Sequence, residues 1–99
     1  MAIKHGLAGN ELADCFLGLG SSYRMLKDYK KSIQVFLEAI NIFPNNNELK
    51  LFLSFTYFDN NELKKAYSSL LILLTLVHKD DNLLAYKNAI NSYLEKISI

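Results

Sequence analysis

The sequence predicts an all-α protein built from tandem helical hairpins, and three observations support this fold class. Apolar residues recur at helical spacing along most of the 99-residue chain. Clusters of Asn and Asp, which favour helix starts because their side chains accept backbone N–H bonds, separate the apolar segments. Strand patterns do not compete, since there is no sustained alternation and no Asn-Gly or Asp-Gly turn. The length fits a single domain.

The spacing predicts five helices, each preceded by a short polar cluster. Asn10 is expected to cap the first helix and Asp28 the second. Pro44 should end the second helix, because proline disfavours helical backbone in the residue before it. Asn and Asp residues then precede each later segment. The predicted helices cover residues 11–25, 29–43, 48–58, 62–77 and 82–97, and their short connections make neighbours pack antiparallel.

Composition and charge exclude several classes of function. The net charge of +1 gives no field that would gather nucleic acid or an anionic membrane surface. The most apolar run, Leu70 to Val77, has eight residues and is far shorter than the ~20 that cross a membrane. Residues 1–10 contain no apolar segment of the length of a secretory signal. Cys15 is the single cysteine, which favours a reducing compartment, so we expect a cytoplasmic protein.

The sequence offers no convincing catalytic, cofactor or metal site. Gly18 and Gly20 resemble part of a phosphate loop, but no strand precedes them and no Walker lysine follows, so a packing role is favoured. His78 lies near two aspartates at a turn, where Asp is the expected helix cap and metal binding is not needed to explain it. Cys15 lacks partners for nucleophilic catalysis. We therefore expect no enzyme activity, no cofactor and no metal.

An internal repeat with a period of 34 residues divides the chain. The aligned pairs are Leu19 with Leu53, Gly20 with Ser54, Tyr23 with Tyr57, Ser32 with Ala66, Phe36 with Leu70 and Ala39 with Leu73. Two helices per 34-residue unit are typical of the tetratricopeptide repeat (TPR), which the chain resembles. The first unit meets the pattern of that family at Phe16, Leu19, Gly20, Tyr23, Ser32, Phe36, Ala39 and Pro44.

The second unit departs from the pattern, because Lys50 replaces the large residue, Leu73 replaces the small one and His78 stands in place of proline. The resemblance implies a right-handed α-solenoid in one domain. Its parts would be an N-terminal tail (1–10), a first repeat (11–46), a degenerate second repeat (47–80) and a capping helix (81–99). Two units and a cap are fewer than the three or so repeats usually needed, so we expect a homodimer or an obligate heterocomplex.

In TPR proteins the first helix of each unit lines a concave groove, and the resemblance assigns six residues to it. Most are large and apolar, so we predict that the groove binds an apolar segment of a protein or peptide. An alternative is that some, Phe58 especially, pack under a neighbouring helix or the cap. The predicted groove residues are Leu17, Ser21, Arg24, Leu51, Phe55 and Phe58. The helix over residues 62–77 is apolar all round and offers a second surface, suited to a dimer.

The run from Cys15 to Gly20, the two units and the final amphipathic helix resemble part of the small TPR chaperones of bacterial type III secretion systems. These chaperones hold export substrates or apparatus subunits in the cytoplasm. The resemblance therefore implies a cytoplasmic chaperone that holds a partner in its groove. The alternative is a TPR scaffold or regulatory adaptor that joins two folded proteins by its outer face.

Overall fold

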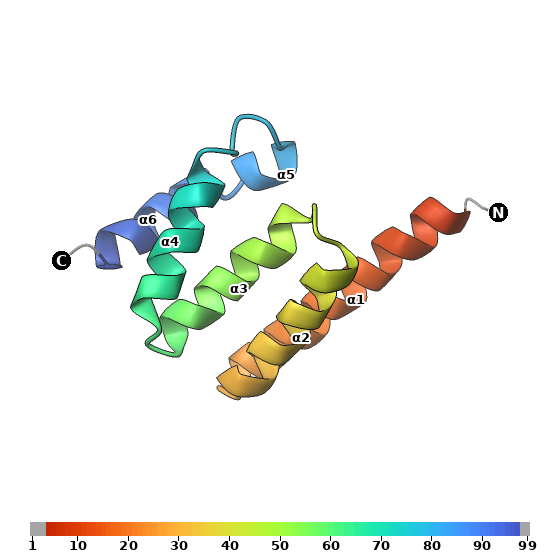
Figure 1. Ribbon diagram of the computed structural model, residues 1–99, viewed down its shortest axis with the longest axis horizontal. Coiled ribbons are helices and arrows are strands. Elements are labelled where there is room, and N and C mark those ends of the chain that lie inside the picture. Colours follow the sequence, from red (N-terminus) through yellow and green to blue (C-terminus); the bar gives the residue numbers. More distant parts are fainter. Residues whose placement is uncertain (1–3, 98–99) are drawn as a thin grey trace.

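The computed structural model describes the backbone of residues 4–97 and the side chains of residues 11–97. This part of the chain is all-α and contains no strand, which confirms the predicted fold class. Figure 1 shows the helices packed as successive neighbours, α1 with α2, α2 with α3, α3 with α4 and α4 with α6. The helices are α1 (Lys4–Met25), α2 (Tyr29–Ile42), α3 (Asn47–Asp59), α4 (Leu63–Leu74), α5 (Asp81–Leu84) and α6 (Lys87–Ile97).

Polar residues start three of the helices as the sequence predicts. The side chain of Asp28 accepts a hydrogen bond from the backbone of Lys31 at the start of α2. Asn46 does the same at the start of α3, where its Oδ1 lies 3.0 Å from the backbone nitrogen of Leu49. Asp80 accepts from two backbone N–H groups at the start of α5. These bonds satisfy donors that have no partner inside the helix.

The predicted start of α1 is wrong. The helix begins at Lys4, so Asn10 lies inside it and residues 4–10 of the predicted tail are helical. Gly6 and Gly9 lower helix propensity by about 1 kcal/mol each, but this cost does not end the helix. Residues 1–3 of the predicted tail lie outside the described part of the chain.

The 34-residue period is visible in the backbone. Lys27 and Asn61, which are 34 positions apart, both have φ of 64° and occupy the turns that join α1 to α2 and α3 to α4. A left-handed backbone is strained for lysine and easier for asparagine. The same turn geometry in both units shows that the two hairpins repeat each other, although their side chains differ.

The C-terminal third departs from the predicted helices. Helix α4 ends at Leu74 instead of residue 77, and the Thr75 hydroxyl donates to the carbonyl of Ile72 at 2.6 Å. The turns that follow place Val77 in the core, where it is 1% exposed. The single helix expected over residues 82–97 is two helices, α5 and α6, and the break falls beside Tyr86. The Tyr86 hydroxyl donates to Glu48 on α3, which ties the break to the second unit.

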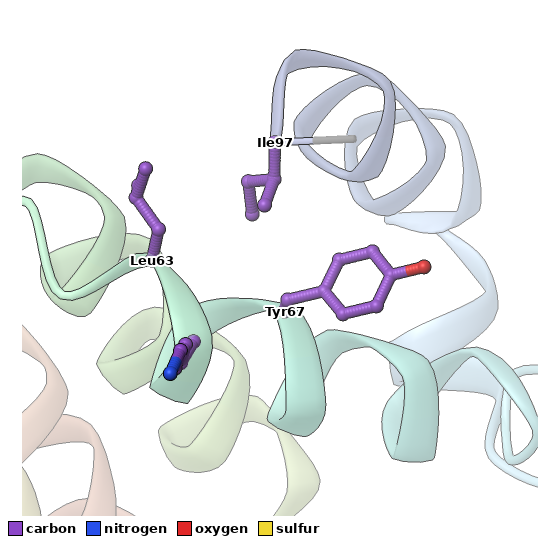
Figure 2. A pocket seen from close by; sticks show the side chains of 4 residues that line it. Leu63, Tyr67 and Ile97 are labelled. Carbon is purple, nitrogen blue, oxygen red and sulfur yellow. The ribbon is translucent and has the colours of Figure 1, made fainter. Parts of the chain in front are cut away.

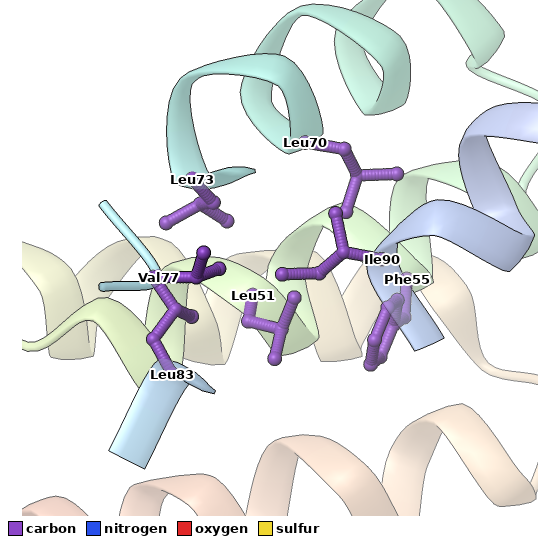
Figure 3. Packing of buried hydrophobic residues seen from close by; sticks show 7 residues of the cluster. All are labelled: Leu51, Phe55, Leu70, Leu73, Val77, Leu83 and Ile90. Carbon is purple, nitrogen blue, oxygen red and sulfur yellow. The ribbon is translucent and has the colours of Figure 1, made fainter. Parts of the chain in front are cut away.

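Two apolar clusters hold the helices together. The first joins the first hairpin to α3 and contains Phe36, Ala39, Leu49 and Leu53. The second, shown in Figure 3, joins α3 and α4 to the cap, which we define as α5 and α6. Its buried members are Leu51, Phe55, Leu70, Leu73, Val77, Leu83 and Ile90.

Gly20 and Ser32 allow the close crossing of α1 and α2 that the repeat pattern predicts. A Cβ atom on Gly20 would lie 2.5 Å from Cζ of Phe36, so the ring occupies the space that a side chain would need. The Ser32 hydroxyl donates to the Gly20 carbonyl at 2.8 Å and lies 3.3 Å from the Thr56 hydroxyl of α3. The crossing therefore depends on small residues and a buried polar link.

Candidate protein-binding surfaces

Two of the six predicted groove residues are buried in the second apolar cluster. Leu51 is 0% exposed and Phe55 is 5% exposed. Figure 3 shows both beside Ile90, which comes from α6. The prediction that they are accessible in an open groove is therefore wrong, because the cap covers the face of α3 that carries them.

Tyr93 of α6 contributes to this covering. Its ring stacks on Phe55 with centroids 4.3 Å apart and meets Phe58 edge-on at 5.0 Å. Aromatic pairs of this kind add about 0.5–1.5 kcal/mol beyond the area they bury. The alternative in which Phe58 packs against the terminal cap therefore fits this part of the structure.

Arg24 connects three helices through its side-chain contacts, and we call this set of contacts the tie. Its Nε donates to Asp59 Oδ2 at 2.6 Å, and its Nη2 donates to the Tyr93 hydroxyl at 3.0 Å. The guanidinium also lies over the Phe55 ring, 5.5 Å from the centroid. Burial lowers the pKa of Arg24, but the hydrogen bond and charge of Asp59 outweigh it, so the net pKa is raised. The guanidinium is thus fixed as a cation that links α1, α3 and α6.

The other two predicted groove residues, Leu17 and Ser21, both lie on α1. Leu17 is half-buried and packs against the cluster between the first hairpin and α3. Ser21 is also half-buried on α1. The structure therefore gathers Arg24, Phe55 and Phe58 around Tyr93, and it places Leu17 in one apolar cluster and Leu51 in the other.

An open apolar hollow of about 330 Å³ lies on the other side of the molecule, between α2 and α4, with α3 as its floor. Leu37 of α2 and Ile72 of α4 stand at its edges and are 49% and 63% exposed. We call it the outer groove. Its lining residues are Leu37, Ile40, Lys50, Leu53, Ser69, Ile72 and Leu73.

The outer groove lies where the second unit departs from the repeat pattern. Lys50 occupies the position that Phe16 holds in the first unit, and Ser69 occupies the position of Val35, which is buried. Two large apolar side chains are thus replaced by a flexible cation and a small hydroxyl. The sequence contained this signal in the degenerate position of Lys50, but it gave no indication that a hollow forms there.

Lys50 is the charged member of the outer groove. Its side chain is half-buried, and the ion pairs formed among residues 11–97 do not include it. A cation at the edge of an apolar hollow favours a ligand that combines apolar groups with an anionic one. The groove thus has a defined chemistry.

A second hollow, of about 370 Å³, lies between α4 and α6 and is shown in Figure 2. Leu63 and Tyr67 of α4 and Ile97 of α6 point into it, and Lys64 completes its lining. Leu63 and Tyr67 are 39% and 37% exposed. Helix α4 therefore borders two apolar hollows on different faces, as expected from a helix that is apolar all round.

Two absences concern only the part of the chain that the structure describes. No group of three or more His, Cys, Asp or Glu side chains gathers there in a way that could hold a metal ion. Within the same residues, no helix has the length and apolar character required to cross a membrane.

Comparison with known proteins gives one family match. Residues 13–46 match the model of the tetratricopeptide repeat family, and they include all of α2 and most of α1. No curated protein matches the sequence. The match covers about a third of the chain and coincides with the unit in which Gly20 and Phe36 make the close helix crossing. It supports one tetratricopeptide repeat at residues 13–46, and repeats of this family mediate protein–protein interaction.

Proposed function

We propose that this chain is a protein-binding module that holds an apolar segment of a partner polypeptide in the outer groove. The observation that carries the proposal is the pair of exposed side chains, Leu37 and Ile72, at the edges of an apolar hollow. Each large apolar side chain left in water forgoes about 1.5–3 kcal/mol relative to full burial. Covering this hollow with apolar groups of a partner recovers part of that free energy.

The charge of Lys50 narrows the class of partner. Because the amine has no carboxylate partner among the described side chains, a segment that brings an Asp or Glu to the groove forms a new ion pair. Partial burial under the bound segment would strengthen that pair relative to one on an open surface. The proposed ligand is therefore an apolar segment that carries at least one acidic residue.

Resemblance to the small chaperones of bacterial type III secretion supports a finer proposal about the partner. In this finer proposal the partner is an export substrate or an apparatus subunit that the chain holds in the cytoplasm before secretion. In this proposal Leu17, Ser21 and Phe58, which keep partial exposure on the α1–α3 face, contribute a further contact. Arg24 contributes through its hydrogen bond to Tyr93, and the buried Leu51 and Phe55 pack beneath the α1–α3 face.

Selection of peptides from a random displayed library against the full chain tests the groove directly. We expect apolar peptides with an Asp or Glu, and we expect Ile72→Asp to weaken their binding at least about tenfold. The Lys50→Glu variant should reverse the selected charge, so that Lys or Arg replaces the acidic residue. A selected set that is the same for Lys50→Glu and for the natural chain would contradict the proposal. Circular dichroism verifies that both variants stay folded.

A second candidate function is an adaptor that joins two proteins, and the hollow between α4 and α6 favours it. This hollow is separate from the outer groove and has its own exposed lining, Leu63 and Tyr67. An adaptor binds two segments at once, so Tyr67→Asp should remove one binding event and leave the groove peptides unaffected. A chaperone with one client segment should show a single binding event in both forms.

A further inference from the structure

The outer groove is lined by side chains that project from three helices. Its seven lining residues all lie inside α2, α3 and α4, and Figure 1 shows α3 between the other two. Backbone N–H and C=O groups inside a helix bond to one another along the helix axis. Near the end of α4, the carbonyls of Ile72 and Leu73 accept hydrogen bonds from the turn that follows. The groove therefore offers a ligand side chains rather than backbone groups to pair with.

Only two of the lining side chains are polar, Lys50 and Ser69, and the other five are aliphatic. The Ser69 hydroxyl donates to the carbonyl of Lys65 at 2.7 Å and lies 2.6 Å from the Ser54 hydroxyl. It is thus engaged inside the second hairpin. The Lys50 amine is the polar group that remains to meet a ligand, and it pairs with an anion and not with a peptide N–H group.

Common modes of peptide recognition differ in what a groove must provide. A segment that adds to a sheet needs a strand edge, and residues 4–97 contain no strand. A polyproline segment needs a groove lined by aromatic rings, and the seven lining residues include none. An amphipathic helix needs an apolar groove alone, because its own backbone groups are bonded internally. The lining therefore favours a helical ligand over an extended one.

The cap shows this mode of packing inside the chain itself. Helix α6 covers another face of the α3–α4 hairpin, where Ile90 is fully buried and Tyr93, Leu94 and Ile97 pack against the second apolar cluster. Their spacing is that of one face of a helix. The hairpin thus already accommodates a helix that carries apolar residues at this spacing.

The position of Lys50 indicates where the acidic residue of a ligand lies. The Ser54 and Ser69 hydroxyls pair α3 with α4, and the short turn between these helices makes them antiparallel. Lys50 lies one turn before Ser54, so it is level with Leu73, which lies one turn after Ser69. The cation therefore stands at one end of the hollow. The carboxylate of a bound helix belongs one turn away from the apolar side chains that fill the rest.

We infer that the segment held in the outer groove is an amphipathic helix of another protein, with two apolar residues one turn apart and an acidic residue one turn beyond them. The hollow of about 330 Å³ is at the small end of ligand sites, which fits two apolar side chains. The inference rests on the proposed function, since it concerns the same groove. It adds the conformation of the ligand and the spacing of its contacts.

Two synthetic peptides of identical composition, each about four helical turns long, test the spacing against the full chain. The helix-spaced peptide has two leucines four positions apart, with a glutamate three positions before the pair and another three positions after it, in an alanine and glutamine background. The strand-spaced peptide has the same residues at every second position. We expect the helix-spaced peptide to bind at least about tenfold more tightly in fluorescence anisotropy. Equal affinities, or tighter binding of the strand-spaced peptide, would overturn the inference and leave the proposed function intact.

The conformation of the bound peptide gives a second readout. In an isotope-labelled helix-spaced peptide, the Cα resonances should move to helical values when the chain is added. Proline at a position between the leucines that faces away from the groove should weaken binding at least about tenfold, because it breaks the helix without removing a contact. Bound Cα resonances typical of an extended chain would overturn the inference, again without affecting the proposed function.

Two variants of the chain separate a failure of the inference from a failure of the proposed function. Ile72→Asp alters the edge of the groove, whereas Leu71→Asp alters a neighbour that is 41% exposed and is not among the lining residues. The helix-spaced peptide should lose affinity with Ile72→Asp and keep it with Leu71→Asp. Absence of binding by both peptides, or binding that neither variant changes, would overturn the proposed function together with the inference. Self-association of the chain that Ile72→Asp abolishes would make a second copy the occupant and overturn the inference alone.

Discussion

The two helical hairpins share a backbone pattern but are stabilised differently. The first, α1 and α2, follows the family pattern and has one side of α1 open to solvent, where Leu12 and Leu19 are exposed. The second, α3 and α4, follows the pattern poorly, yet it is covered on one side by the first hairpin and on the other by the cap. The residues of the repeat pattern therefore determine how the two helices of a hairpin cross. The burial of the hairpin's outer faces depends instead on which helices lie next to it.

Equivalent leucines make this comparison measurable. Leu51 and Leu17 hold the same repeat position, but Leu51 is 0% exposed and Leu17 is half-buried. We expect Leu51→Ala to lower the free energy of unfolding by about 2–5 kcal/mol, the range for a buried leucine. Leu17→Ala should cost less than half as much. Urea denaturation followed by circular dichroism measures both, and equal losses would show that the cap does not bury α3 as described.

The helix crossing of the first hairpin gives the next largest effect. Gly20→Ser introduces the residue that the second unit holds at this position, and its Cβ would meet the Phe36 ring. Overpacking of this kind lowers the free energy of unfolding by about 1–3 kcal/mol.

Gly18→Ala is the matched control, since nothing lies within 4 Å of its added Cβ. It should raise stability by about 0.5–1 kcal/mol, because alanine favours a helix interior. Thermal unfolding measures the pair. Unchanged stability of the Gly20→Ser protein would mean that α1 and α2 cross at the same distance as α3 and α4.

The tie between the hairpins and the cap should have a smaller effect. Arg24 and Asp59 are 23% and 26% exposed at the side chain, so water screens part of their attraction. We expect a coupling free energy of about 1 kcal/mol in a double-mutant cycle of Arg24→Met and Asp59→Asn. A coupling near zero would mean that packing of Tyr93 on Phe55 positions α6 without help from the tie.

The smallest expected effect is a pH dependence at the break between α5 and α6. Burial, then the charge and hydrogen bond of Glu48, raise the pKa of Tyr86 above its usual value. Above about pH 10 the unfolded chain therefore loses this proton first, and stability falls as the pH rises. Tyr86→Phe should show a shallower fall between about pH 9 and about pH 11 in urea denaturation. Identical slopes would contradict the contact with Glu48.

Local sequence patterns were sufficient to predict most of the fold. Interactions between residues close in the chain account for helices α2 and α3, for the hydrogen bond of Asp28 at the start of α2, and for the 34-residue period. The start of α1 was predicted wrongly, because a possible cap at Asn10 does not end a helix that continues through it. The break between α5 and α6 was missed, because it depends on contacts of Tyr86 with α3.

The binding surface was harder to predict than the fold. Helical phase correctly places Leu51 and Phe55 on one face of α3, but it does not say which helix covers that face. The outer groove depends on three helices and on the replacement of Phe16 by Lys50 in the second unit. Sequence reasoning noted the replacement as a loss of pattern, and only the packing shows that it leaves a hollow.

Amide chemical-shift mapping with a peptide selected against the chain tests the central claim most directly. An apolar peptide with an acidic residue should shift the resonances of Leu37, Ile40 and Ile72 and lose this effect with Lys50→Glu. Shifts confined to the α1–α3 face, at Leu17, Ser21 and Phe58, would contradict the outer groove as the binding site.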